Sequence, residues 1–394
     1  MNKMKILYHH RTASRDGQST HIEEMIHALR AIQCEVTVAC PQVDTQDATG
    51  GSGGWVGKIK KLLPKQLYEL AELGYSWVAY KRLVSTIVEF RPDVIYERYN
   101  LFLLAGVWAK RRYSLPLIVE VNAPMAQERR LYGGLAWPRL ADWAEHYVWR
   151  NADFVLPVSQ VLADYIISKG VAADRVVVIP NGIREEQYVN LPSIDQAKNQ
   201  LNLQGKLVIG FTGFVREWDR LDRIVKWMAA SPNANNAHLL VIGDGPARAE
   251  IEQCAAECGI SDRVSFTGAV TRQEVPALSM AFDIALQTAL VPYASPLCLF
   301  EYLALSKAIV APDQPNHHEI LTDNVDSILY NPNDDQGIER ALDRLCSNAE
   351  LRSQISKEAG KVIATKKLTW LAHAQKVLSL ASKTTASKKQ RLTA

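Results

Sequence analysis

The sequence predicts an α/β protein in which two parallel sheets follow one another along the chain. Short apolar stretches alternate with amphipathic helical stretches in both halves, and a repeated strand–helix–strand order predicts parallel strands. The pattern begins afresh after a polar, irregular stretch at Glu185–Gln204. The length of 394 residues also exceeds one average domain, and two domains of about 150–200 residues are expected.

The first half opens with a strand, a glycine-bearing loop and a helix. We expect the strand at Lys5–His9, the loop at His10–Ser19 with Gly17 near its end, and the helix at Thr20–Ala31. This order is the opening unit of a Rossmann-like sheet. Further strands are predicted at Glu35–Ala39, Asp93–Tyr96, Leu117–Val121, Asp153–Val158 and Arg175–Ile179.

The second half repeats the pattern with strands that end in glycine. The predicted strands are Leu207–Thr212, His238–Ile242, Arg263–Phe266, Ile284–Leu286 and Ala308–Ala311, and the helices between them include Leu221–Ala230, Ala247–Cys258 and Val275–Met280. We expect residues 1–188 to form the first domain and residues 189–367 the second, the two facing each other across a cleft. A last helix at about 368–382 crosses back to the first domain, and the basic tail 383–394 is expected to be disordered.

The stretch Pro292–Pro312 is typical of a phosphate site at a helix start. Ser295 is a good N-cap and Pro296 suits the first helical position. The amides from Ser295 to Leu297, together with the helix dipole, suit an anion such as a pyrophosphate. Glu301 lies one turn further on, roughly 6 Å along the axis, where a carboxylate would meet the ribose of a bound nucleotide. The alternative is an ordinary capped helix with a surface glutamate.

Composition excludes several classes of protein. The net charge of +3 is too small to indicate nucleic-acid binding. The six cysteines show neither C-x-x-C nor disulfide-like spacing, and with no signal-peptide core or apolar run of 18 residues they indicate a reduced, cytoplasmic protein. A dinucleotide-binding dehydrogenase is disfavoured, because the first turn offers only Gly17 and Gly243-Asp244-Gly245 is followed by Pro246.

One segment suggests contact with a membrane. In Trp55–Leu73, Trp55 and nearby Ile and Leu residues alternate with Lys58, Lys60, Lys61 and Lys65. This pattern fits an amphipathic segment lying on an anionic surface at the inner face of the membrane. A solvated helix that covers the domain core is the alternative.

Several motifs occur in one order along the chain. They are Pro180-Asn181-Gly182-Ile183, Phe211-Thr212-Gly213, Ile242-Gly243-Asp244-Gly245-Pro246, Phe266-Thr267-Gly268 and Ser295-Pro296 followed by Phe300-Glu301-Tyr302. This order resembles the retaining family-4 glycosyltransferases of the two-Rossmann GT-B architecture. Tyr8-His9-His10-Arg11-Thr12, Asp16-Gly17-Gln18, Tyr96-Glu97-Arg98-Tyr99 and Glu120-Val121-Asn122-Ala123-Pro124 resemble the branch found in bacterial exopolysaccharide and surface-glycan gene clusters.

The resemblance implies that the second domain binds a nucleotide diphosphate sugar without a metal or other cofactor. It implies Glu301 on the ribose, the backbone of Ser295–Leu297 on the diphosphate, the base near Gly268 and Val270, and Gly17 close to the donor phosphate. Together with residues that depart from the family pattern, the predicted donor-binding residues are Gly17, Gly213, Arg216, Arg220, Gly243, Gly268, Val270, Tyr293, Ser295, Pro296, Leu297 and Glu301.

The sequence departs from the family pattern around the reacting groups. The paired-glutamate motif E-x7-E keeps Glu301 but has Tyr293 in the first position, which usually contacts the transferred sugar. The G-R-x-x-x-E-K loop has Phe214 and Asp219 in place of both cations. A leaving diphosphate still needs positive charge, which Arg216, or else Arg220, is expected to supply.

The acceptor side is less defined by the sequence. Asn122 stands where the family has a histidine, and Glu120 or Glu128 could accept a proton. His9, His10, Arg11 and His21 could touch the sugar or phosphate, and Arg98 and Arg129 could hold a phosphate of the acceptor. The structural alternative for each is a satisfied core or surface group.

The resemblance implies transfer of a hexosyl-type residue with retention, by front-face displacement in which the leaving phosphate deprotonates the acceptor. We expect a glycan or lipid-linked acceptor in bacterial polysaccharide synthesis. The alternatives are a nucleotide-sugar 2-epimerase of the same architecture and a non-catalytic nucleotide-sugar-binding subunit.

Overall fold

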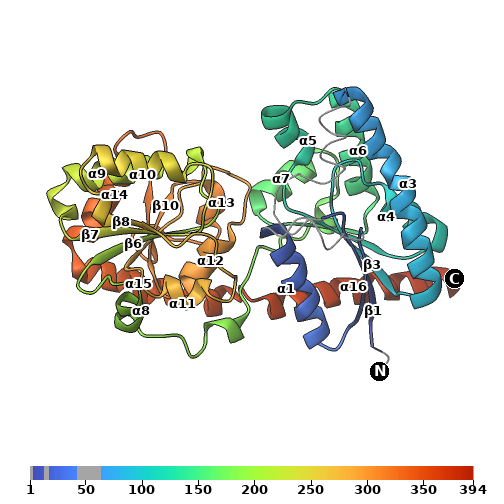
Figure 1. Cartoon of the computed structure of the whole chain (residues 1–394). Coiled ribbons are helices and arrows are strands. Elements are labelled where there is room, and N and C mark those ends of the chain that lie inside the picture. Colours follow the sequence, from blue (N-terminus) through green and yellow to red (C-terminus); the bar gives the residue numbers. More distant parts are fainter. Residues whose placement is uncertain (1–2, 13–16, 42–63, 394) are drawn as a thin grey trace. The chain divides into compact units, whose positions relative to one another are not determined.

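The computed structural model describes residues 3–12, 17–41 and 64–393, which form two units with one parallel sheet each (Figure 1). Unit 1 contains Met1–Asn181, Tyr293–Ser295 and Trp370–Ala394, and unit 2 contains Gly182–Pro292 and Pro296–Thr369. The chain therefore changes unit after Asn181, earlier than the expected boundary at 188. It returns at Trp370, and the short segment Tyr293–Ser295 also belongs to unit 1.

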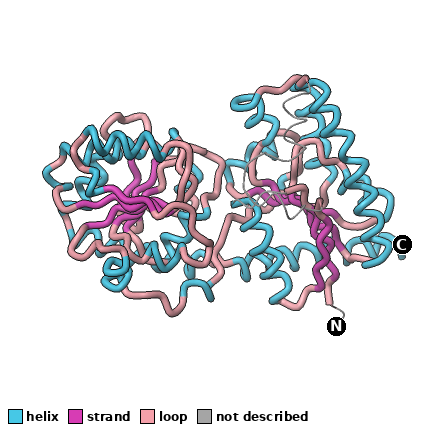
Figure 2. Tube along the Cα trace, viewed as in Figure 1, coloured by secondary structure: helices cyan, strands magenta, loops and turns pink. Residues whose placement is uncertain are grey.

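Unit 1 is built on a five-stranded sheet in the order β2-β1-β3-β4-β5, with every strand pair parallel. Figure 2 shows the strands in magenta among cyan helices. The strands are β1 Lys5–His9, β2 Glu35–Ala39, β3 Val94–Arg98, β4 Leu117–Val121 and β5 Phe154–Pro157. The helices are α1 Gly17–Ala31, α3 Lys65–Phe90, α4 Ala105–Tyr113, α5 Met125–Glu128, η1 Arg129–Gly133, α6 Pro138–Asn151, α7 Gln160–Ser168, η2 Ala173–Arg175 and α16 Trp370–Thr393.

Alternation along the strands assigns their side chains to two layers. Leu7, Ile95 and Val119 lie in the same apolar cluster as residues of α3, α4 and α6. Their neighbours in sequence, including Tyr8 and Glu120, point to the other face because successive strand side chains alternate. Helices α1 and α16 pack against each other on that second face.

Unit 2 has a six-stranded parallel sheet in the order β11-β10-β9-β6-β7-β8, with apolar clusters on both faces. Its strands are β6 Leu207–Thr212, β7 Ala237–Ile242, β8 Val264–Phe266, β9 Ile284–Leu286, β10 Ala308–Pro312 and β11 Ser327–Tyr330. Its helices are η3 Glu185–Tyr188, α8 Ile194–Gln200, η4 Glu217–Asp219, α9 Leu221–Ala230, η5 Pro232–Ala234, α10 Arg248–Glu257, η6 Ser261–Arg263, α11 Val275–Ser279, α12 Leu297–Ala304, α13 Pro315–His318, α14 Gly337–Ser347 and α15 Ala349–Lys366.

Three expectations about local structure are corrected. The strand predicted at Arg175–Ile179 is only a single bridge between Val155 and Val176, because Pro157 of β5 has no N–H to extend the ladder. Gly17 belongs to the first turn of α1, not to the preceding loop. The tail expected to be disordered continues α16 as far as Thr393, since residues 383–393 contain neither glycine nor proline and include several good helix formers.

The predicted membrane segment is described only in part. Residues 55–63 lie outside the described residues. From Lys65 onward the same stretch forms the first turns of α3, a helix of 26 residues.

Candidate functional site

The carboxyl ends of the unit 2 strands bring three predicted glycines to one edge of the sheet. Gly213, Gly243 and Gly268 follow β6, β7 and β8 and have φ values of 147°, 138° and 72°. A Cβ at Gly243 would lie 2.0 Å from the carbonyl oxygen of Gly213. The loops after β6 and β7 therefore touch backbone to backbone, an approach and a φ that favour glycine.

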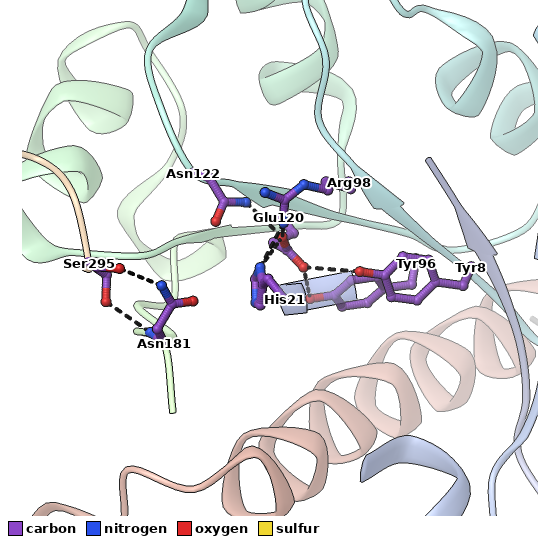
Figure 3. Close-up of polar contacts among 8 residues, drawn as sticks. All are labelled: Tyr8, His21, Tyr96, Arg98, Glu120, Asn122, Asn181 and Ser295. Carbon is purple, nitrogen blue, oxygen red and sulfur yellow. Dashed lines mark hydrogen bonds and ion pairs between the residues drawn. The ribbon is translucent and has the colours of Figure 1, made fainter. Parts of the chain in front are cut away.

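Helix α12 begins at this edge, but its first turn differs from the sequence prediction. The helix starts at Leu297, Pro296 is the residue before it, and no side chain caps the start. Ser295 instead accepts a hydrogen bond from the backbone N–H of Asn181 over 2.9 Å, and its carbonyl accepts the Asn181 amide (Figure 3). The extended Pro296 backbone, with ψ of 126°, moves the helix start one residue beyond the expected position.

Glu301 is buried in α12, with 9% of its surface exposed. The Nη2 atom of Arg272 lies 3.8 Å from Glu301 Oε1. The alternative of an exposed surface glutamate is therefore wrong. Sequence reasoning missed Arg272, although it follows Gly268 in one of the loops at the edge that carries the other candidates.

Arg216 lies between two exposed aromatic rings. Its guanidinium carbon is 5.2 Å from the Phe214 ring centre and 4.9 Å from that of Trp218. The Asp219 carboxylate accepts the backbone N–H of Arg216 over 2.8 Å. Asp219, which replaces a cation of the family pattern, thus orders the backbone that carries Arg216.

The two remaining donor-side candidates differ in environment. Arg220 is exposed and lies between η4 and α9, and its backbone is in the left-handed conformation with φ of 53°. Val270 is half-buried against the apolar cluster that contains Leu299 and Phe300 of α12. A nucleobase near Val270 would therefore meet a loop that is anchored to the helix carrying Glu301.

In unit 1, a buried carboxylate organises the edge where β1, β3 and β4 end (Figure 3). Glu120 is 3% exposed. Its Oε2 accepts hydrogen bonds from Tyr96 over 2.9 Å and Tyr8 over 3.4 Å, and Oε1 accepts one from Arg98 over 2.5 Å. Arg98 and Glu120 are direct partners in the register of β3 and β4, which places both on the α1 face.

His21 and Asn122 complete this cluster. His21 Nδ1, from α1, lies 2.9 Å from Glu120 Oε1 and 2.7 Å from Arg98 Nη1. The Asn122 amide donates to Glu120 over 2.7 Å, and Figure 3 shows its oxygen pointing away from the carboxylate. The His21 ring packs on Trp370 of α16, with 4.7 Å between ring centres.

The electrostatics of the cluster oppose a proton-accepting role for Glu120. Burial alone would raise its pKa, but His21, Arg98 and the hydrogen bond from Asn122 together hold the pKa well below its usual range. Burial and the Glu120 charge raise the pKa of Tyr8 and Tyr96 well above that of a free phenol. Glu120 is therefore a buried anion that orders its neighbours, an environment that disfavours the proton-accepting role considered from the sequence.

A second pair lies on the opposite face of the same edge. His9 and Glu97 are partners in the register of β1 and β3, and His9 Nδ1 is 2.6 Å from Glu97 Oε2. Both are buried, so His9 is held in the interior and is a poor candidate for acceptor contact. His10 is half-buried, and burial, followed by the neighbouring His9, lowers its pKa to about 4.

Two of the three arginines predicted at the acceptor side, Arg11 and Arg129, share one carboxylate. Arg129 forms two hydrogen bonds with Glu72 of α3, one of them of 2.8 Å, and Arg11 Nη2 lies 3.5 Å from the same carboxylate. Glu128, the residue before Arg129, accepts a hydrogen bond from the hydroxyl of Tyr293. Burial and then Glu128 raise the pKa of Tyr293 well above its usual value.

Within the described residues, no three His, Cys, Asp or Glu side chains are arranged to hold a metal ion. No helix in the described part of the chain is long and apolar enough to cross a membrane.

Comparison with known families identifies the family of the chain. Residues 16–182 match the glycosyl transferase 4-like domain, and residues 193–362 match the glycosyl transferases group 1 family. The chain belongs to the glycosyltransferases. Its two parallel-sheet units are those of the GT-B fold.

Curated relatives of this glycosyltransferase resemble it over part of their length. It is 30% identical to a 2-deoxystreptamine glucosyltransferase of Streptomyces kanamyceticus over 196 residues, which are 47% of this chain and 49% of the relative. It is 27% identical to the lipopolysaccharide core biosynthesis glycosyltransferase LpsD of Rhizobium meliloti, covering 58% and 64% of the two chains. The matches thus span about half to two thirds of these relatives.

The fold is shared with solved structures at low sequence identity. HepE of Anabaena, solved in complex with UDP-glucose, superposes with a TM-score of 0.71 at 19% identity, covering 96% of this chain and all of HepE. At this identity the likeness establishes the fold alone.

Proposed function

We propose that this glycosyltransferase moves a sugar, with retention, from a nucleotide diphosphate sugar to a glycan or lipid-linked acceptor. The observation that carries the proposal is the pairing of a helix start with a buried carboxylate on one short helix. The backbone at Leu297 opens α12 at the carboxyl edge of the sheet, and Glu301 lies in its second turn. A diphosphate fits the first feature, and ribose hydroxyls fit the second.

The neighbouring loops support the same ligand. Glycines at the ends of β6, β7 and β8 leave backbone rather than side chains at this edge, as close approach of a nucleotide requires. HepE, which has the same fold, has been solved with UDP and with UDP-glucose. LpsD is named for lipopolysaccharide core biosynthesis, which favours a surface glycan as the acceptor.

The chemistry proposed for the transfer uses the donor's own phosphate. Arg216 neutralises charge on the departing diphosphate, and no metal is required. Because Glu120 is already bound to Arg98, His21 and two tyrosines, the departing phosphate oxygen takes the proton of the attacking hydroxyl. Asn122, oriented by Glu120, and the half-buried His10 and Arg11 are the proposed acceptor contacts. The proposed location is cytoplasmic, at the inner face of the membrane.

Thermal unfolding with nucleoside diphosphates and then with their sugars tests the donor site. We expect the nucleoside diphosphate with one particular nucleobase to raise the melting temperature of the wild type. Glu301→Gln should lower the affinity for that diphosphate at least about tenfold, which corresponds to roughly 1.4 kcal/mol. Glu250→Gln, an exposed change on α10, is the control and should bind as the wild type does. Unchanged binding by Glu301→Gln would overturn the assignment.

The reaction itself is tested with the donor identified in this way. A transferase slowly releases the nucleoside diphosphate without acceptor, and NMR of the glycosylated product shows the anomeric configuration of the donor. Conversion of the intact donor to a second nucleotide sugar would identify a 2-epimerase. Binding with no turnover under any acceptor would identify a binding subunit.

A further inference from the structure

Helix α3 carries an exposed apolar stripe on the side turned away from the unit 1 core. Its large apolar residues there are Leu67, Leu70, Trp77, Val78 and Val88, which are 46% to 62% exposed. At 3.6 residues per turn they fall within roughly 100° of the helix circumference. The opposite side, which includes Leu83 and Ile87, packs into the core. The helix is therefore apolar on two sides, and the described residues cover only one of them.

Further large apolar side chains are exposed in the segment between α5 and α6. Leu131 and Tyr132 in η1, Trp137 before α6 and Trp143 within α6 are all exposed, Tyr132 to 84%. The Glu69 carboxylate of α3 accepts the backbone N–H groups of residues 136 and 137 over 2.6 and 2.9 Å, and so joins this segment to the start of α3. We call the exposed residues of α3, η1 and α6 the outer aromatic surface.

The charges around the outer aromatic surface are predominantly positive. The exposed charged residues of α3, α4, η1 and α6, all within the described part of the chain, are Lys65, Lys81, Arg111, Arg112, Arg130, Arg139 and Arg150 against Glu89, and Asp142, whose side chain is 40% exposed, pairs with Arg130. This excess lies on one helical layer of a chain whose total net charge is only +3. Two copies of this surface would bring like charges together, which disfavours self-association.

We propose that the outer aromatic surface binds the headgroup region of an anionic lipid bilayer. Trp and Tyr prefer the interface between water and lipid, and Lys and Arg are attracted to anionic headgroups. This surface belongs to described helices, whereas residues 55–63 of the segment predicted from sequence lie outside the described residues, and α3 follows that segment directly in the chain. The proposal rests on the proposed function in that the membrane would supply the lipid-linked acceptor. Its test needs neither donor nor acceptor.

Co-sedimentation of the full chain with vesicles tests the proposal. The vesicles contain phosphatidylethanolamine with a quarter phosphatidylglycerol, and vesicles of phosphatidylcholine are the neutral comparison. We expect binding to the anionic vesicles that weakens with added salt. The double variant Trp77→Gln, Trp143→Gln should bind at least about fivefold more weakly, and Arg112→Glu with Arg139→Glu should lose about fivefold or more per residue.

Val189→Gln is the matched control, because Val189 is 59% exposed but belongs to unit 2. It should bind vesicles as the wild type does. Equal binding by all variants, or wild-type binding to neutral vesicles alone, would overturn the proposal. Concentration-dependent dimerisation that the tryptophan variants abolish, without vesicle binding, would assign the surface to a protein partner instead.

Donor turnover by the same variants separates this proposal from the proposed function. Variants that lose vesicle binding should still release nucleoside diphosphate from the donor in solution. Loss of vesicle binding with normal turnover supports the surface. If neither the wild type nor any variant turns over the donor while the wild type binds vesicles, the proposed transferase activity is refuted and the proposed membrane-binding surface is not.

Discussion

Arg98 and Glu120 stand opposite each other on β3 and β4, and the Arg98 guanidinium donates to the Glu120 carboxylate over 2.5 Å. Both side chains are almost completely buried. A buried ion pair adds little net stability, but removal of one partner leaves an uncompensated charge. This pair therefore makes the edge of the first sheet sensitive to single substitutions.

Glu120→Ala should lower the free energy of unfolding by about 3–5 kcal/mol, because Arg98 would remain buried without a counter-charge. Urea unfolding followed by circular dichroism measures the change. Asp142→Asn breaks the exposed pair of Arg130 and Asp142 and should cost at most about 1 kcal/mol. Equal costs for the two variants would contradict the view that burial makes the difference.

Glu145 should make stability fall as the pH rises. The carboxyl is buried, and burial raises its pKa to about 7, although it accepts hydrogen bonds from Tyr99 and the backbone of Ala126. Between the ordinary carboxyl pKa of about 4.3 and pH 7 the folded state holds a proton that the unfolded state has lost. The free energy of unfolding should therefore fall by roughly 1.4 kcal/mol per pH unit in the middle of this window and more slowly as the pH approaches 7.

Glu145→Gln removes this titration. Its free energy of unfolding should vary less between pH 5 and pH 8 than that of the wild type, and the variant should be the more stable protein at pH 8. Parallel pH profiles for the two proteins would show that Glu145 titrates normally.

Arg216→Ala should lower kcat at least about tenfold, since the positive charge that stabilises the departing diphosphate is lost. Steady-state rates with the identified donor provide the measurement. Arg220→Ala serves as the comparison and should retain most activity. If the two results are reversed, Arg220 is the cation that acts on the diphosphate.

Gly243→Ala should weaken donor binding, because the added Cβ would lie 2.0 Å from the carbonyl oxygen of Gly213 and the backbone φ is 138°. Calorimetric titration with the nucleoside diphosphate measures the loss. Gly74→Ala is the matched control. It lies inside α3 with open space around its Cβ position and should stabilise the protein by about 0.5–1 kcal/mol. Normal donor affinity in Gly243→Ala would show that the loop adjusts.

Tyr293→Phe and Glu128→Gln should act as one unit. The Tyr293 hydroxyl donates to Glu128, so removal of either partner should cost nearly as much activity as removal of both, with a coupling of about 0.5–3 kcal/mol in a double-mutant cycle. The coupling energy is obtained from the kcat/KM values of the wild type, the two single variants and the double variant. Additive effects would separate Tyr293 from Glu128 in function.

Much of the fold was predictable from local pattern. The strands at Lys5–His9, Glu35–Ala39 and Leu207–Thr212 are confirmed residue for residue, because buried parallel strands are short apolar runs with clear ends. The parallel order and the GT-B fold are confirmed too. The missing strand near Val176 depended on a partner strand whose proline ends the ladder, which a local pattern does not reveal.

The sequence indicated which candidate residues lie at the strand ends, but not how their side chains pair. Residues at the carboxyl ends of neighbouring parallel strands share an edge, and three candidates named from the sequence, His9, Arg98 and Glu120, lie at this edge of the first sheet. Burial and register decided their environments: Glu120 lies among two tyrosines, Arg98 and His21, and His9 lies on the opposite face beside Glu97.

The sequence by itself determined the two-sheet architecture and the family. Periodic apolar patterns predicted the two sheets, and the order of the motifs indicated the family. Only the tertiary structure decided which polar groups are paired inside the protein, because the paired groups are far apart in the sequence and are brought together by folding. It separated Ser295 from the start of α12 and attached it to Asn181. It also exposed the outer aromatic surface, whose residues in the sequence resemble any other helical core positions.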